Sequence, residues 1–170
     1  MSGINSEITL RPAVAADFGA ITAIYADAVE TGTATFELDP PSLAEMTARF
    51  DDLMAGGFPW LVAVADGKVM GYAYAGPYRA RPAYRFTVEN SIYLAAEARR
   101  RGIGLALLER LVADTASHGF RQMIAVIGDS ANAASIAVHA RAGFQMVGTF
   151  QEVGFKFGRW LDTVLMQRAL

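Results

Sequence analysis

Apolar residues recur along this chain with two different periods, and the alternation of the two periods restricts the fold to the α/β class. Helical spacing is clear behind Asp17, where Phe18, Ile21 and Tyr25 fall on one face, and again from Ile103 onward. Extended segments are predicted at residues 7–12, 60–65, 68–75, 87–94 and 123–127 and in two stretches after residue 142, and helices at 18–29, 42–56, 103–112 and 132–142. Strands that alternate with helices predict an α/β fold with mixed strand order.

Short-range signals set several boundaries. Asp17 is expected to cap the first helix. Ser42 and Glu45 form a capping box that opens the second helix, and the pair Gly56-Gly57 is expected to end it. Asp66-Gly67 joins two extended runs and is typical of a two-residue hairpin turn. The chain is therefore expected to form a hairpin directly after the second helix.

The size and composition of the chain favour one well-packed domain. Its 170 residues match a single domain of residues 1–170, at a soft prior of about 150 residues per domain. Hydrophobic residues make up 53% and charged residues 19%, so the apolar surface is sufficient for a core without disulfides or metals. This composition excludes intrinsic disorder.

Charge and residue usage exclude several function classes. The 15 Lys and Arg nearly balance the 17 Asp and Glu, which disfavours binding of nucleic acid through overall charge. Zero cysteines exclude thiolate metal sites, disulfides and a cysteine nucleophile, and two histidines argue against a histidine-rich metal site, so no metal is expected. The N-terminus has no signal-like pattern, and no apolar run approaches about 18 residues, so the protein is expected to be cytoplasmic and not bound to a membrane.

The most informative motif is Arg-Arg-Arg-Gly-Ile-Gly at residues 99–104, between a predicted strand and an amphipathic helix. A helix N-terminus offers unpaired backbone N–H groups and the positive end of the helix dipole, and glycine lets the chain approach a pyrophosphate closely. The motif is neither a dinucleotide fingerprint nor a P-loop, because it lacks a third glycine in register and a Gly-Lys-Ser/Thr. It predicts an anion-binding turn, with a solvated helix start as the alternative.

This Arg-x-x-Gly-x-Gly element, followed by a helix, a strand and the segment 132–144, resembles the GNAT superfamily of acetyl-CoA-dependent N-acetyltransferases. The stretches 87–94, 125–127 and 153–162, together with His139, are similar to the phosphinothricin and methionine sulfoximine acetyltransferase family, and the similarity spans nearly the whole chain. The resemblance implies the GNAT fold, a mixed, mostly antiparallel β-sheet whose central parallel strands splay apart to admit the cofactor, flanked by helices. It also implies acetyl-CoA as co-substrate and a homodimer.

The resemblance assigns roles in cofactor binding. The backbone of Ile92, Tyr93 and Leu94 would face the acetyl-pantetheine arm, because an unpaired strand edge offers amide and carbonyl groups to an amide-bearing ligand. One freed N–H near Leu94 would polarise the thioester carbonyl. The residues that would hold the pyrophosphate are Arg100, Arg101, Gly102, Ile103, Gly104 and Leu105. Asn132 corresponds to the superfamily residue near the cofactor and also suits a helix N-cap. Ile92 and Leu94 equally suit a plain core strand.

Two side chains are predicted to move protons. Acetyl transfer needs a neutral amine, and Glu89 is the candidate base because partial burial in an apolar, hydroxyl-rich strand would raise its pKa. The alternative for Glu89 is an ion pair with Arg85 or another loop arginine. His139 stands seven residues after Asn132, where many superfamily members have Tyr, and is the candidate acid for the departing thiolate; the alternative is a core histidine. His118 is expected only to add a favourable charge at a helix C-terminus.

A basic and aromatic loop at residues 76–85 precedes Glu89. Its guanidinium groups suit a small anionic amino-acid substrate, because a guanidinium binds carboxylate or phosphinate bidentately; the alternative is a solvated loop. The resemblance maps substrate contacts to Arg79, Ala80, Arg81, Glu89, Asn90 and Ser91. Thr35, Phe36 and Glu37 are expected to close the opposite wall, and Lys156 to reach the site of a partner subunit.

These features and the resemblance together predict direct transfer of an acetyl group from acetyl-CoA to the α-amine of a small amino-acid analogue. The substrate type is phosphinothricin, methionine sulfoximine or methionine sulfone. One alternative is acetylation of a peptide N-terminus or a polyamine, although a loop with three arginines would repel a polycation. The other is an acyl-CoA-binding sensor without catalysis, which the presence of Glu89 and His139 argues against.

Overall fold

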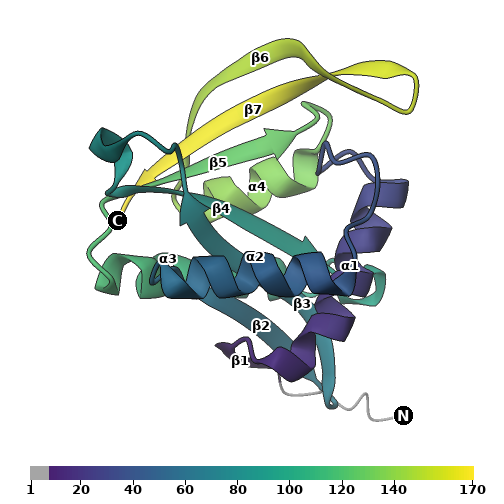
Figure 1. Ribbon diagram of the computed structural model, residues 1–170. Helices are drawn as coiled ribbons and strands as arrows, with labels where there is room; N and C mark the ends of the chain where they lie inside the picture. The colour runs from purple at the N-terminus through teal and green to yellow at the C-terminus, as the bar shows by residue number, and fades with distance from the viewer. Residues whose placement is uncertain (1–7) are drawn as a thin grey trace.

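A mixed β-sheet forms the centre of the protein, and helices pack against it (Figure 1). The structure is a computed structural model that describes residues 8–170, so Glu7 of the predicted first strand lies outside the described residues. Within these residues the sheet has seven strands in the order β1-β2-β3-β4-β5-β7-β6. The strands are β1 (Thr9–Pro12), β2 (Trp60–Ala65), β3 (Lys68–Pro77), β4 (Thr87–Leu94), β5 (Gln122–Gly128), β6 (Gln145–Lys156) and β7 (Arg159–Ala169).

β4 and β5 are the one parallel pair among the described strands, and all other pairs are antiparallel. Their register ends at Asn90 opposite Ala125. β4 continues to Leu94 and β5 to Gly128, so the two strands diverge beyond Asn90 and leave facing edges without ladder hydrogen bonds. This arrangement confirms the predicted sheet, which is mostly antiparallel with splayed central parallel strands.

The helices lie on both faces of the sheet. They are α1 (Phe18–Thr31), α2 (Leu43–Ala55), α3 (Ile103–Ser117) and α4 (Ala133–Arg141). Because neighbouring residues of a strand point to opposite faces, β2 sends Trp60 and Val62 toward α1 and α2, and Leu61 and Ala63 toward α3. The face covered by α1 and α2 is rich in aromatic rings, whereas the face covered by α3 and α4 is mainly aliphatic.

Local sequence signals set several boundaries as predicted. Ser42 Oγ accepts a hydrogen bond from Glu45 N at 3.2 Å, and Glu45 Oε2 accepts one from Ser42 N at 2.7 Å, so the capping box that opens α2 is confirmed. Gly57, just after α2, has a left-handed backbone with φ of +76°. Asp66 and Gly67 have φ of +50° and +72°, which confirms the two-residue turn between β2 and β3.

The prediction that the Asp17 side chain caps the first helix is wrong, because this side chain bonds to groups outside that helix. Asp17 occupies the N-cap position of α1, but its side chain makes no hydrogen bond to that helix. The carboxylate instead pairs with Arg11 at 2.7 Å and accepts a hydrogen bond from Val14 N at 2.8 Å. Hydrogen bonding to Arg11 holds the pKa of Asp17 below its usual value. Asp17 therefore ties the start of α1 to β1.

The remaining elements differ from prediction mainly in length. β3 extends to Pro77 and α3 to Ser117, and β6 and β7 confirm the two final extended segments. The loop between β3 and β4 contains a short 3₁₀ turn, Pro82–Tyr84. His118 lies at the C-cap of α3, as expected. No helix among residues 8–170 is long and apolar enough to cross a membrane.

Candidate active site

The divergence of β4 and β5 opens a cavity of about 50 Å³ between the two strands. Its lining comes from β4, β5, α4, the turn before α4 and the segment that follows α1, and comprises Ala34, Asn90, Ser91, Ile92, Tyr93, Ala125, Val126, Ile127, Gly128, Asn132, Ser135 and His139. The predicted site residues among them are Asn90, Ser91, Ile92, Tyr93, Asn132 and His139. The fold therefore gathers predicted cofactor, substrate and catalytic residues around one opening in the sheet.

The turn before α3 has the backbone conformation that an anion cradle requires. Arg100 and Gly102 are both left-handed, with φ of +59° and +78°, and Gly102 is the N-cap of α3 with no side-chain cap. The first N–H groups of this helix are therefore free of a capping side chain. A Cβ at Gly104 would meet Leu94 Cδ1 at 3.4 Å, so the turn adjoins the end of β4 that is predicted to face the cofactor. These residues fit the pyrophosphate and pantetheine arm of acetyl-CoA.

The side chains of the turn divide between solvent and core. Arg100 and Arg101 are exposed and form no ion pair among the described residues. Ile103 is 1% exposed, so only its backbone is left for a ligand. Leu105 is half-buried and packs against the core. Asn132 Oδ1 accepts a hydrogen bond from Ser135 N at 3.2 Å, so Asn132 caps α4 while it lines the cavity.

Glu89 lies half-buried in β4, opposite the start of the basic loop of residues 76–85. It pairs with Gly76 in the β3–β4 ladder, next to residues 78–86. Burial raises the pKa of the Glu89 carboxyl, and the charge of Arg79 acts in the opposite direction. The carboxylate has no hydrogen bond or ion pair within residues 8–170. Arg85 donates instead to Pro82 O at 3.2 Å, so the alternative of an ion pair between Glu89 and Arg85 is wrong.

A group of tyrosines beside Glu89 was not predicted. Tyr25 of α1, Tyr72 and Tyr74 of β3 and Tyr93 of β4 pack with ring centroids 5.0 to 6.4 Å apart. Burial raises the pKa of all four hydroxyls, that of Tyr25 to about 12, so all stay neutral at physiological pH. The alternation of Tyr72 and Tyr74 with alanine along β3 is the sequence signal that identifies them. They give Glu89 a wall of low polarity.

His139 and Asn90 form a buried pair, 2% and 6% exposed. His139 Nδ1 donates to Ser135 O at 2.8 Å, and Nε2 lies 3.0 Å from Asn90 Oδ1. Burial lowers the pKa of His139 below its usual value. Asn90 Nδ2 donates to Ile124 O at 3.3 Å, so the Asn90 side chain is directed to His139 and β5 and not to the basic loop of residues 76–85.

The two candidate catalytic residues lie on opposite faces of the sheet. Because alternate residues of a strand point to opposite faces, Glu89 shares the α1 and α2 face with Tyr93, whereas Asn90 meets His139 of α4 on the other face. The opening between β4 and β5 joins the two faces. An acyl donor held by the α3 turn and an amine held beside Glu89 would meet at this opening.

The arginines of the basic loop of residues 76–85 are exposed. The Arg79 guanidinium lies 4.4 Å from the centre of the Tyr78 ring and donates to Tyr78 O at 3.1 Å. The Arg81 side chain has no ion pair or hydrogen bond within the described part of the chain, although Arg81 O accepts a hydrogen bond from Tyr84 N at 2.9 Å. Ala80 lies between them and is also exposed. The substrate contacts assigned to Arg79, Ala80 and Arg81 stay predictions.

Residues 33–37 contact β5 and β6, and Ala34 lines the cavity; the expectation that Thr35, Phe36 and Glu37 close the opposite wall stays a prediction. A Cβ at Gly128 would lie 2.4 Å from Thr33 O, and one at Gly154 would lie 2.3 Å from Phe36 Cε2. Such close approaches require glycine on β5 and β6. Asp129 fixes the segment further, because its carboxylate accepts a hydrogen bond from Thr33 Oγ1 at 2.9 Å.

Polar contacts hold the same segment to its own chain. Thr35 Oγ1 and Tyr25 OH share a hydrogen bond of 2.9 Å, and Glu37 pairs with Arg49 at 2.7 Å. Lys156 Nζ donates to Thr35 O at 2.9 Å, and Lys156 is 3% exposed. The prediction that Lys156 reaches the site of a partner subunit is therefore wrong.

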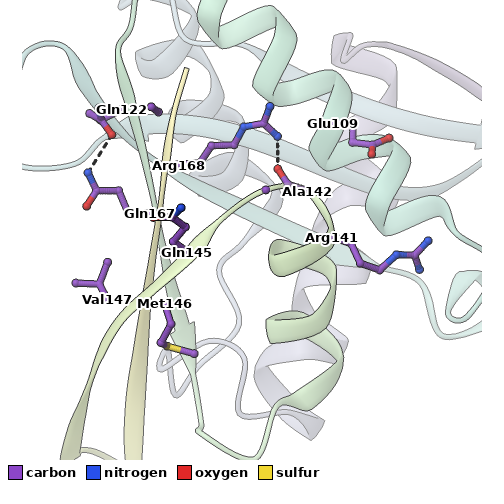
Figure 2. Close-up of a pocket in the computed structure, with 11 residues that line it drawn as sticks. Glu109, Gln122, Arg141, Ala142, Gln145, Met146, Val147, Gln167 and Arg168 are labelled. Atoms are coloured by element: carbon purple, nitrogen blue, oxygen red, sulfur yellow. Dashed lines mark hydrogen bonds between the residues drawn. The ribbon is translucent and has the colours of Figure 1, made fainter.

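A larger cavity of about 670 Å³ lies at the C-terminal end of α4 (Figure 2). Its lining includes Glu109, Arg141 and Arg168, and Figure 2 shows the Arg168 guanidinium donating to the carbonyl of Ala142. No predicted site residue lines this cavity. Within residues 8–170, no cluster of three His, Asp or Glu side chains is arranged to hold a metal ion.

Comparison with known families places most of the chain in one of them. Residues 10–165 match the acetyltransferase (GNAT) domain family. The chain is also similar to a phosphinothricin N-acetyltransferase of Alcaligenes faecalis, with 54% identity over 154 residues that cover 91% of this chain and 78% of the relative.

Two further relatives extend the comparison. An L-methionine sulfoximine/L-methionine sulfone acetyltransferase of Pseudomonas aeruginosa is 44% identical over 160 residues, which cover 94% of this chain and 92% of the relative. A solved structure of a GNAT superfamily phosphinothricin acetyltransferase from Sinorhizobium meliloti in complex with AcCoA superposes with a TM-score of 0.93. It is 54% identical, and the match covers 96% of this chain and 88% of that one.

Proposed function

The protein belongs to the GNAT acetyltransferase family, and on this premise we propose that it transfers the acetyl group of acetyl-CoA to the α-amine of a small anionic amino acid. The substrate class is that of phosphinothricin, methionine sulfoximine and methionine sulfone, on which the named relatives act. We further propose that residues 1–170 act as one acetyltransferase domain, since the family match spans residues 10–165.

The chain holds acetyl-CoA with two elements. The free N–H groups at the start of α3, with Gly102 and Gly104, receive the pyrophosphate, and Arg100 and Arg101 add positive charge. The part of β4 beyond Asn90 offers a backbone edge to the pantetheine arm. When bound, acetyl-CoA supplies an acetyl thioester at the opening between β4 and β5. A backbone N–H near Leu94 donates to the thioester carbonyl.

Glu89 removes the proton from the substrate ammonium, directly or through a water molecule. The carboxylate has no partner within residues 8–170, and burial raises its pKa, which suits a general base. The tyrosine wall excludes water from the amine and favours its neutral form. Ser91, on the same face of β4, lines the opening where the amine binds.

Arg79 and Arg81 bind the acidic groups of the substrate. Both guanidinium groups are exposed in the loop next to Glu89, and a planar guanidinium binds carboxylate or phosphinate bidentately. On the opposite face, His139 holds a proton at Nε2 close to the opening and delivers it to the departing thiolate. Since no cysteine is present, transfer is direct from donor to amine.

The unpaired, half-buried Glu89, next in sequence to the cavity-lining Asn90 and Ser91, carries this proposal. We expect purified protein to release CoA from acetyl-CoA in the presence of phosphinothricin or methionine sulfone, and not in the presence of spermidine. If calorimetry shows that the protein binds acetyl-CoA, and no added amine causes release of CoA, the protein is a sensor. Turnover with a peptide N-terminus and not with the amino-acid analogues would favour the alternative substrate class.

We also propose that the protein is a homodimer. The β6–β7 hairpin lies at one edge of the sheet, and β6 is the edge strand. Its apolar side chains that are more than half exposed are Met146, Val147, Phe150, Val153, Phe155, Phe157 and Trp160. An exposed apolar edge of this kind is typical of a protein interface. Sedimentation should give a dimer for the wild type and a monomer for the double variant Phe155→Glu/Trp160→Glu; a wild-type monomer contradicts the proposal.

A further inference from the structure

A bidentate ion pair joins the segment after α1 to helix α2. Arg49 Nη1 donates to Glu37 Oε1 at 2.7 Å, and Arg49 Nη2 donates to Glu37 Oε2 at 3.3 Å. The Arg49 and Glu37 side chains are 45% and 36% exposed, so a ligand in solvent can reach both groups. Hydrogen bonding to Glu37 raises the pKa of Arg49 above its usual value, so the guanidinium stays charged. The pair therefore presents one positive and one negative group side by side.

Contacts place this pair on the face of the sheet that carries Glu89. Glu37 N donates to Thr35 Oγ1 at 3.3 Å, and Thr35 Oγ1 shares a hydrogen bond of 2.9 Å with Tyr25 OH. The Tyr25 ring lies 5.0 Å from the ring of Tyr93, which is on the same face of β4 as Glu89. The segment that holds Glu37 is therefore fixed against the tyrosine wall beside the proposed base.

The hydroxyl of Tyr74 is close to both the ion pair and Glu89. Burial raises the pKa of this hydroxyl, and the charges of Arg49, Glu89 and Glu37 also act on it. The Tyr74 ring stacks on Trp60 with the two centroids 4.2 Å apart, which limits its movement. An amino acid whose amine binds beside Glu89 can therefore reach the ion pair with the end of its side chain.

The cations around Glu89 differ in whether a carboxylate neutralises them. The exposed guanidinium groups of Arg79 and Arg81 form no ion pair within residues 8–170, whereas that of Arg49 is paired with Glu37. A fully charged group binds best to a cation that lacks a partner, so the α-carboxylate of the substrate is expected to bind Arg79 or Arg81. The end of the substrate side chain is then left to the ion pair.

A paired guanidinium and carboxylate suit a neutral, polar group. Arg49 keeps N–H groups that Glu37 does not use, and these can donate to an oxygen of a sulfone or a sulfoximine. The N–H of a sulfoximine can in turn donate to the Glu37 carboxylate. The phosphinate of phosphinothricin carries a negative charge, and its oxygens would lie beside the Glu37 carboxylate, which repels them. The pair therefore favours a neutral side-chain end over an anionic one.

We propose that Glu37 and Arg49 are specificity-determining residues that select amino acids of the sulfone and sulfoximine class over those with an anionic side-chain end. Arg49 donates to the sulfone or sulfoximine oxygen, and Glu37 both holds Arg49 in place and repels a phosphinate. This inference rests on the proposed function for the position of the amine beside Glu89 and of the α-carboxylate beside the basic loop of residues 76–85.

The direct test measures the Kd values of methionine sulfone and phosphinothricin by calorimetry, with CoA present to fill the cofactor site. We expect wild-type protein to bind methionine sulfone more tightly. Glu37→Gln keeps an acceptor for Arg49 and removes the negative charge, so phosphinothricin should bind about fivefold more tightly, the size of one exposed charge interaction. The Kd of methionine sulfone should stay unchanged. Glu30→Gln, at an exposed position of α1, is the matched control and should change neither Kd.

The sign of the change separates specificity from a structural role. If the ion pair only held residues 33–37 in place, Glu37→Gln would not improve the binding of either compound. Tighter binding of phosphinothricin than of methionine sulfone by wild-type protein overturns the inference. An equal ratio of the two Kd values in wild type and Glu37→Gln also overturns it.

A second variant, Arg49→Met, removes the donor and leaves Glu37 without its cation. The Kd of methionine sulfone should rise about fivefold, the net effect of one hydrogen bond, and that of phosphinothricin should rise by a larger factor. Equal losses for the two compounds contradict the role of the Glu37 charge. Because these measurements involve no turnover, a failure of the inference is distinct from a failure of the proposed acetyl transfer, which CoA release tests.

Discussion

The two faces of β4 treat their polar side chains in opposite ways. On the face toward α1 and α2, Glu89 is half-buried and has no partner within residues 8–170, beside tyrosines that stay neutral. On the face toward α3 and α4, Asn90 and His139 are more deeply buried, and each of their polar atoms has a partner.

This difference indicates that the two faces of β4 have different roles. An unpaired carboxylate destabilises the folded state, so the half-buried position of Glu89 is best explained by a reaction that needs a free base. A fully paired network holds its groups in fixed orientations, which suits the binding of a cofactor. The comparison therefore predicts that substitution of Glu89 changes the rate through proton removal from the amine, and that substitution of His139 changes proton delivery to the thiolate and the pH response.

The largest effect is expected from Glu89→Gln, which keeps the shape of the side chain and removes the base. We expect kcat/KM at pH 7 to fall about 10² to 10⁴-fold and to recover in part at high pH, where free amine is abundant. Since burial raises the pKa of Glu89 above 4.5, the ionised carboxylate destabilises the folded protein at neutral pH, and the variant should unfold at a higher Tm. A wild-type rate at pH 7 would show that another group takes the proton.

Gly104→Ala is expected to weaken acetyl-CoA binding about tenfold, because a methyl group would stand where the backbone meets the pyrophosphate. The added Cβ makes only an ordinary contact of 3.4 Å with Leu94 Cδ1, so the fold should be kept. Gly104 suits this test better than Gly102, whose φ of +78° strains any other residue. Gly19→Ala in α1, where a Cβ meets nothing within 4 Å, is the matched control. Equal Kd values for the two variants would contradict the proposal that the turn before α3 binds the pyrophosphate.

Arg81→Ala should raise the KM for phosphinothricin about fivefold and leave the Kd of acetyl-CoA unchanged. The effect is modest because Arg81 is exposed and its charge is screened by solvent. Arg85→Ala is the control in the same loop, since the Arg85 guanidinium is already engaged with Pro82 O and the Phe86 ring. If both variants raise KM equally, the loop acts through its overall charge and not through a specific contact.

The smallest effect concerns stability. Because burial lowers the pKa of His139 below 6.5, the unfolded chain takes up a proton at that position more readily than the folded protein does. The free energy of unfolding should therefore decrease as the pH falls below 6.5, and His139→Gln should show a smaller decrease. Urea titrations at several pH values measure this difference. Parallel curves for the two proteins would contradict the direction of the shift.

Much of the fold was predictable because it follows from short-range patterns. Ser42 and Glu45 satisfy the first turn of α2, and Asp66 and Gly67 adopt the left-handed backbone of a two-residue turn, through interactions within four residues. Asp17 shows the limit of such signals. Its carboxylate could bind either the first N–H groups of α1 or a nearby cation, and the proximity of Arg11 in space decided between them.

The site shows the same contrast between features set by short-range patterns and features set by contacts in space. Periodicity and spacing placed Glu89 on a strand and residues 99–104 at a helix start, and the family resemblance assigned their roles. The sequence did not predict the tyrosine wall, the glycine contacts of Gly128 and Gly154, or the use of Lys156 by its own chain. Each of these depends on residues far apart in the chain.

The sequence by itself determined which residues alternate along β4 and which lie at the start of α3, because backbone geometry fixes side-chain periods of two and of about 3.6 residues. Only the tertiary structure decided that Glu89 stays unpaired while Asn90 binds His139 and β5. That outcome depends on which helix covers which face of the sheet and on where β4 and β5 part. Both are consequences of long-range packing, which no local pattern specifies.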